Sequence, residues 1–237
     1  MQDASEQKNT SAAKSPPVST LRSTSIETMV DKVYAELERR IVTCELAPGS
    51  LLSEADLSKQ MNVSRTPIGE ALQRLAREGL VMILPRRGIL VTDISVSEQV
   101  QLLELRRDVS RFIARTGARR AKPHERERMR EIAGDFAQAG HTQDDARMIE
   151  VDKEFHDLFV QCAHNTYATR AMVSMDSLSR RFWLFHRGSG GEHPASVRLH
   201  SDIALAIAAG DEGAAERASD ALSDYLDEFT RNTLNSI

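Results

Sequence analysis

The sequence predicts a mainly α-helical protein, with an N-terminal winged helix-turn-helix (three helices plus a β-hairpin wing) and a C-terminal all-α bundle. Residues 53–88 show helix, turn, helix and hairpin signals in that order. After residue 96, apolar residues recur only at helical spacing. A chain of 237 residues can form two compact domains. We expect a disordered tail over 1–25 and domains over 26–94 and 97–237.

The tail and the first helix differ in composition. Residues 1–25 are rich in Ser, Thr, Ala and Gln and lack apolar periodicity, which is typical of disorder. From Ile26 to Val42 apolar residues recur every three or four positions. This spacing predicts a helix whose apolar face packs into the core of the first domain.

The helix-turn-helix signal comes from residues that cap, start and stop helices. Ser53 and Asp56 have the spacing of a capping box, which predicts a helix start. A second helix should begin within residues 64–67, because Pro67 is tolerated in a first turn whose N–H groups have no helical partner. Gly79 supplies a left-handed stop for that helix.

Two segments rich in branched residues flank residues 85–88 and predict a β-hairpin with arginines at its tip. Residues 57–92 carry six basic and two acidic side chains, whereas the whole chain has a net charge of −4. A helix N-terminus can contact base edges in the major groove, while basic and hydroxyl groups hold phosphates. The groups placed for this are Ser64, Arg65, Thr66, Arg86 and Arg87. Double-stranded DNA is therefore the expected partner.

This stretch, extended back to Val33, resembles the winged helix-turn-helix of the GntR family of bacterial transcription regulators. The matching words are LAPGSLLSEADLSKQMNVSRTPIGEALQRLAREGLV and PRRG. The resemblance implies that Arg65 contacts DNA, together with Ser64, Thr66 and the wing glycine Gly88. The chain departs from the family at Gly69 and Ala55, where arginines that reach DNA are usual or frequent.

The second domain should contain six helices with breaks at Gly, Pro, His and Asn residues. The expected helices are 97–121, 123–139, 143–163, 166–187, 195–209 and 211–235. No strand-like alternation interrupts them, so we expect them to pack as a bundle.

Four ionisable residues fall on apolar helix faces of this bundle. Asp152 and His156 are one turn apart within the apolar arc of their helix, a spacing that suits both a core polar pair and a bidentate metal site. His200 lies in line with apolar residues, as does Arg106. Arg106 could bind the carboxylate of a ligand, because its planar donors match that group. Alternatively, it could be a structural partner of Asp152 or of a helix C-terminus. Together the four predict a small polar cavity.

Residues 97–235 resemble the FCD effector domain, in the words LLELRRDV, DKEFHDLFV, CAHNTY and RLHSDIALAIAAGDEGAAERASDAL. The resemblance implies one divalent metal (Zn, Ni or Mn) held by Asp152, His156 and His200, with a small organic carboxylate beside it. It also makes Arg106 a recurrent effector-site arginine. The fourth ligand position of the family falls on Leu222, which cannot ligate. Either a three-ligand site remains or the effector binds without metal.

These features favour a homodimeric regulator of a metabolic operon that binds a DNA operator and responds to a small organic acid. The resemblance implies that it is a repressor. One alternative is a metabolite or metal sensor whose DNA binding Gly69 has impaired. A metal-dependent hydrolase is disfavoured, because Glu154 and Asp157 project away from the metal ligands. The chain lacks a membrane-length apolar run and an N-terminal secretion signal, and its two cysteines form no CxxC pair. We therefore expect a cytoplasmic, nucleoid-associated bacterial protein and no enzyme.

Overall fold

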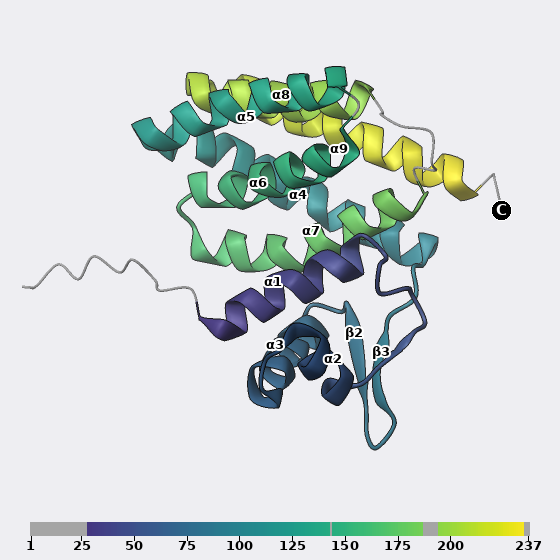
Figure 1. The fold of residues 1–237 in the computed structure, drawn as a ribbon. Coiled ribbons are helices and arrows are strands. Elements are labelled where there is room, and N and C mark those ends of the chain that lie inside the picture. The colour runs from purple at the N-terminus through teal and green to yellow at the C-terminus, as the bar shows by residue number, and fades with distance from the viewer. Residues whose placement is uncertain (1–27, 143, 187–193, 235–237) are drawn as a thin grey trace, which may run out of the picture.

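The computed structural model describes residues 28–142, 144–186 and 194–234, and Figure 1 shows how its elements are arranged. The predicted tail over 1–25 lies outside these residues. The elements are α1 (Met29–Val42), β1 (Leu51–Leu52), α2 (Glu54–Met61), α3 (Arg65–Arg77), β2 (Val81–Leu84), β3 (Gly88–Val91), α4 (Val96–Arg120), α5 (Pro123–Thr142), α6 (Asp145–Cys162), α7 (Thr166–His186), α8 (Pro194–Ala209) and α9 (Glu212–Leu234). The predicted mainly α fold with a winged helix-turn-helix is confirmed.

Capping residues set the helix starts in the N-terminal part. Thr28 and Asp31 form a reciprocal capping box on α1, which satisfies two backbone donors. Ser53 caps α2 by accepting from the Asp56 N–H. Ser64 is the N-cap residue of α3, but its side chain makes no capping hydrogen bond. Its hydroxyl therefore stays available at the exposed end of the helix.

The sheet has three strands in the order β1-β3-β2, all antiparallel. β2 and β3 are the predicted wing, paired through Ile83 and Ile89. β1 was missed by the sequence reading, because two residues are too short for a strand period. Gly88 begins β3 with φ at 104°, and a Cβ there would lie 2.9 Å from the Leu52 carbonyl oxygen. Only glycine fits this close approach of β1.

The six predicted helices of the second domain are present as α4 to α9, with shifted ends. α5 continues through Gly140, where a break was expected, and ends at Thr142. A glycine weakens a helix but does not stop it when the flanking apolar residues are buried. Phe136 and Ala139 on this stretch are both buried in the bundle. Among the described residues, no helix is long and apolar enough to span a lipid bilayer.

Two separate hydrophobic cores support the two parts of the chain. One core joins α1 and α3 to the wing, and the other fills the α4–α9 bundle. The domain limits 26–94 and 97–237 remain a prediction. The largest fully buried side chains of the two cores are Leu37, Ile41, Ile68, Leu72, Leu75, Leu80, Ile113, Met129, Ile132, Phe136, Phe155 and Met172.

α7 lies against α1 and joins the two parts, as Figure 1 shows. Leu178 of α7 packs on the winged-helix core. Arg181 donates to the backbone carbonyls of Thr92 and Asp93, at 3.0 and 3.2 Å. α7 is therefore both a wall of the bundle and the platform on which the winged helix rests.

Candidate DNA-binding surface and ligand cavity

The N-terminus of α3 is an exposed helix end. Ser64, Arg65 and Thr66 are all exposed, while Ile68 on the same helix is fully buried. The buried face anchors α3 on α1, so the first turn projects without rearrangement. In Figure 1 α3 and the wing lie at the end of the molecule that is farthest from α5 and α8. This placement leaves the predicted contact residues free of the helical bundle.

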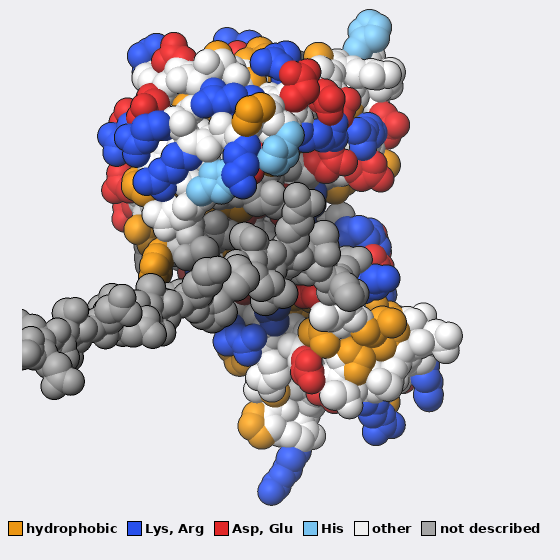
Figure 2. Space-filling view, turned by 90° about the vertical axis from the view of Figure 1, so that its left-hand side faces the viewer, with side chains coloured by type: hydrophobic (Ala, Val, Ile, Leu, Met, Phe, Trp, Pro, Cys, Tyr) orange, Lys and Arg blue, Asp and Glu red, His pale blue; other side chains and the backbone are white. Residues whose placement is uncertain are grey.

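The wing places two arginines at its tip. The Arg87 N–H donates to the Leu84 carbonyl at 3.0 Å, and Arg86 has a left-handed φ of 63°. This closes a tight turn between β2 and β3. Arg86 and Arg87 are exposed, and Figure 2 shows Lys and Arg side chains projecting at this end of the molecule. Gly88, the last of the predicted DNA-contact residues, is the first residue of β3 and follows these arginines directly.

Gly69 lies on the same side of α3 as Arg65, in a shallow groove that Arg77 and Glu54 also line. A Cβ at Gly69 would meet nothing nearer than a Glu54 carboxylate oxygen at 3.8 Å. The position is therefore open, and it carries no side chain that could contact DNA. A glycine here also weakens the helix that presents Arg65.

Gly69→Ala is expected to raise the free energy of unfolding by about 1 kcal/mol, because alanine restores helix propensity without a clash. Urea denaturation of the full chain measures this. Gly134→Ala is the matched comparison, since Gly134 is in the middle of α5 and has nothing within 4 Å of its Cβ position. If Gly69→Ala lost stability and Gly134→Ala did not, the folded protein would require a residue without a side chain at position 69.

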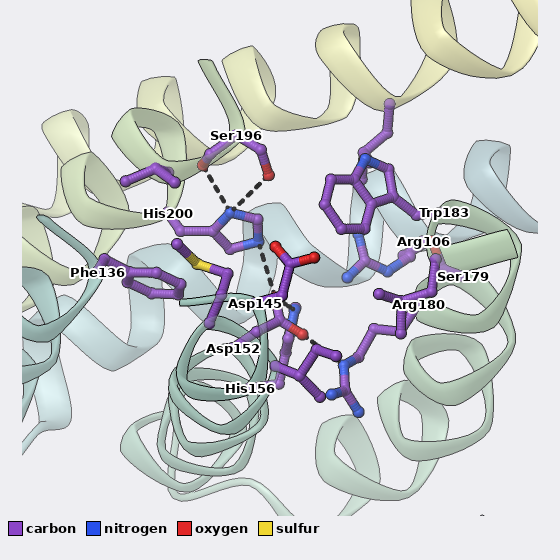
Figure 3. Close-up of a pocket in the computed structure, with 15 residues that line it drawn as sticks. Arg106, Phe136, Asp145, Asp152, His156, Ser179, Arg180, Trp183, Ser196 and His200 are labelled. Carbon is purple, nitrogen blue, oxygen red and sulfur yellow. Dashed lines mark hydrogen bonds and ion pairs between the residues drawn. The ribbon is translucent and has the colours of Figure 1, made fainter. Parts of the chain in front are cut away.

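The candidate ligand cavity is in the helical bundle, between α4, α5, α6, α7, α8 and α9 (Figure 3). One part of its wall is ionisable and consists of Arg106, Asp145, Asp152, His156, Arg180 and His200. The other part is apolar and includes Phe136, Met148, Ile149, Trp183, Leu184, Val197 and Leu226. All four predicted site residues therefore line one cavity, although three different helices supply them.

Asp152, His156 and His200 bring their ligand atoms within 4.8 Å of one another. The Nδ1 atom of His156 is in ion-pair contact with Asp176, at 2.9 Å. His200 Nδ1 donates to the Ser196 carbonyl at 2.8 Å. Both rings therefore turn Nε2 toward Asp152 Oδ1, at 3.6 and 3.8 Å. Such outer partners fix the tautomer of a metal-binding histidine, so the three residues fit a divalent cation.

The protonation of the site depends on its buried charges. Burial lowers the pKa of His200 to about 4, so this ring is neutral near pH 7 and can ligate. Burial also opposes the charged form of His156, but Asp176 and Asp152 outweigh it and raise its pKa. Burial disfavours the Asp152 carboxylate, yet Arg180 and His156 hold its pKa well below the usual range. A cation at His156 Nε2 therefore competes with a proton, because the two carboxylates favour the charged ring.

Two further charged residues contact the predicted site residues, and both are on α7. Asp176 accepts from Arg106 at 3.0 Å, and Arg180 Nε donates to Asp152 Oδ2 at 2.6 Å. The suggested pairing of Arg106 with Asp152 or with a helix C-terminus was therefore wrong. Asp176 and Arg180 are one helical turn apart on α7. This spacing between two charged residues could have indicated from the sequence that both lie on one face of the helix.

Leu222, at the expected fourth ligand position, is buried in the bundle core. The α9 side chain that lines the cavity is Leu226, one turn further on. Neither leucine can bind a metal. A site with three protein ligands keeps a coordination position for an exogenous ligand.

Comparisons with known proteins agree with this architecture. Residues 29–91 match the family "Bacterial regulatory proteins, gntR family", and residues 101–224, more than half of the chain, match the FCD domain. The HTH-type transcriptional repressor RspR of Escherichia coli (strain K12) is 28% identical over 201 residues, which cover 85% of this chain and 87% of RspR. The Nta operon transcriptional regulator of Aminobacter aminovorans is 29% identical over 178 residues, covering 73% and 82% of the two chains.

The solved structures give the same fold. E. coli McbR/YncC superposes with a TM-score of 0.73 at 15% identity, covering 87% of this chain and 99% of that one. A putative GntR regulator from Rhodococcus sp. RHA1 superposes with a TM-score of 0.64 at 24% identity, covering 88% and 98%. The TM-scores support the fold. At these identities the two structures do not indicate which ligand or operator this chain binds.

Proposed function

Because the chain belongs to the gntR family of bacterial regulatory proteins and carries the FCD domain, we propose that it represses a metabolic operon and responds to a small organic acid. It is a transcription regulator, and its relatives are regulators and not enzymes. The observation that carries the proposal is the exposed N-terminus of α3 beside the arginine-tipped wing. A homodimer would present two such helices to a pseudo-palindromic operator in the bacterial nucleoid.

The chemistry of the cavity supports a carboxylate effector. Arg106 is buried, and its Nε atom has no hydrogen-bond partner among the described residues. Arg180 adds a second guanidinium to the same wall. Guanidinium donors match a carboxylate, and Trp183 and Leu226 give an apolar surface for the body of a small acid.

We further propose that Asp152, His156 and His200 hold one divalent cation. Such an ion, when bound, supplies positive charge that attracts an effector carboxylate at its open position. Within the protein, Asp176 and the Ser196 carbonyl orient the two rings, while Arg180 neutralises the second oxygen of Asp152. Arg106 then anchors the carboxylate from the side of α4.

The experiment is a fluorescence anisotropy titration of the protein into labelled DNA from upstream of its own gene. Saturable binding that weakens steeply with salt is the expected result, because released counterions drive phosphate contacts. Absence of binding at low salt would favour the alternative, a metabolite sensor in which Gly69 has removed DNA recognition.

His156→Ala is expected to weaken Zn²⁺ binding by roughly a hundredfold, since it removes one of three ligands and the partner of Asp176. Trp183 is the only tryptophan of the chain and lines the cavity, so its fluorescence reports the titration. His141→Ala, an exposed histidine of α5, is the matched control. DNA affinity without metal should stay unchanged in both variants. A His156→Ala protein that binds Zn²⁺ like wild type would place the metal elsewhere.

A further inference from the structure

Arg180 of α7 is shared between the ligand cavity and the winged helix. Its Nε atom donates to Asp152 Oδ2 at 2.6 Å, inside the cavity, as Figure 3 shows. Its NH1 atom lies 3.6 Å from Oε1 of Glu38, which is on α1. The Arg180 side chain is only 8% exposed, so water does little to screen either interaction. One guanidinium therefore contacts a carboxylate in each part of the protein.

Glu38 has Arg180 of α7 as its cationic partner. The residue is 3% exposed, and the Ser177 hydroxyl donates to the same Oε1 atom at 2.9 Å. Among the described residues, Arg180 is the only cation within 4 Å of the Glu38 carboxylate. A buried carboxylate that loses its cation destabilises the contact in which it is buried. The docking of α1 on α7 therefore depends on where Arg180 directs its charge.

We propose, building on the ligand cavity described above, that Arg180 is the coupling residue through which cavity occupancy controls the docking of the DNA-binding domain. A cation on Asp152 weakens the hold of Asp152 on Arg180 and directs the guanidinium toward Glu38, which tightens docking. An anionic effector attracts the guanidinium into the cavity and leaves Glu38 with the Ser177 hydroxyl alone, which loosens docking. Each ligand acts only through this difference in docking free energy.

The winged-helix core converts this local change into a movement of the DNA-binding surface. Leu37, one residue before Glu38, is fully buried in the core that includes Ile68 and Leu72 of α3. A shift of α1 on α7 therefore carries α3 with it as a rigid body. The neighbouring Arg181 holds the carbonyls of Thr92 and Asp93 instead, so the chain stays tethered after α1 loosens.

A double-variant cycle followed by amide hydrogen exchange tests the coupling without any ligand. Asp152→Asn removes the carboxylate closest to Arg180 and should slow exchange in α1 by roughly fivefold, because the guanidinium is then held less strongly in the cavity and interacts more strongly with Glu38. In the Glu38→Gln background the same change should leave α1 exchange unaltered. Glu36→Gln is the matched control, since Glu36 is on α1 and is partly exposed, with a side chain 43% accessible. In that background Asp152→Asn should still slow exchange.

A second arm uses Zn²⁺ on the full chain and does not depend on how well Asp152→Asn folds. Zn²⁺ should change Trp183 fluorescence in both wild type and Glu38→Gln, but should slow α1 exchange only in wild type. Equal slowing in both proteins would overturn the coupling. A fluorescence response in wild type with no change in α1 exchange would overturn it as well, while the proposed metal site would stand. Coupling in the variant cycle without a Zn²⁺ fluorescence response would support the role of Arg180 and reject the metal site.

Discussion

Arg65→Ala is expected to weaken operator binding by about 10- to 100-fold for each half-site, while the melting temperature stays close to that of wild type. Arg65 is the first residue of α3 and is exposed, so the folded protein loses little when its side chain is removed. A bidentate arginine contact to a base contributes about 1–3 kcal/mol of discrimination. Anisotropy with specific and with scrambled DNA measures both affinity and specificity.

Arg130→Ala is the control for this prediction. Arg130 is an exposed arginine of α5 that pairs with Glu127, so the variant removes one positive charge far from the wing. Operator binding should change by less than about twofold. Full operator affinity in Arg65→Ala, with Arg130→Ala equally unaffected, would contradict the contact assigned to α3.

Asp176→Ala is expected to lower the free energy of unfolding by about 3–5 kcal/mol, the cost of leaving a buried partner charge uncompensated. The Asp176 carboxylate contacts Arg106 at 3.0 Å and His156 at 2.9 Å, and the side chains of both partners are less than 10% exposed. Its removal therefore leaves Arg106 without its ion-pair partner and His156 with Asp152 as its remaining anion. Urea denaturation monitored by circular dichroism measures the loss.

Asp157→Ala provides the comparison for Asp176→Ala. Asp157 is an exposed carboxylate of α6 that pairs with Lys153 one turn away. Exposed pairs of this kind contribute about 0.3–0.5 kcal/mol. If Asp176→Ala were no more destabilising than Asp157→Ala, then Arg106 and His156 would not depend on Asp176 for their charge balance.

Most of the fold could be predicted because its signals are local. The start of α2 follows from the Ser53 cap, and the end of α3 follows from Gly79, whose observed φ is 79°. The bundle helices follow from an apolar period that each segment carries on its own. β1 could not be predicted, because a strand of two residues exists only through its pairing with β3.

The candidate site was predicted in part. Asp152 and His156 share one helix, so a helical wheel alone places them on the same buried face. Arg106 and His200 were found in the same way and do line the same cavity. The partner of each charge was not predictable, because the crossing of α4, α6 and α7 decides which guanidinium meets which carboxylate.

The sequence by itself determined the family, the order of the helices, the exposed N-terminus of α3 and the three residues that could hold a metal ion. Periodicity, caps and glycines act within one or two turns, so these features need no knowledge of distant contacts. Only the tertiary structure decided that Asp176 balances Arg106 and that Arg180 lies between Asp152 and Glu38. Those pairings join residues 28 to 142 positions apart, and packing alone brings such residues into one low-dielectric site.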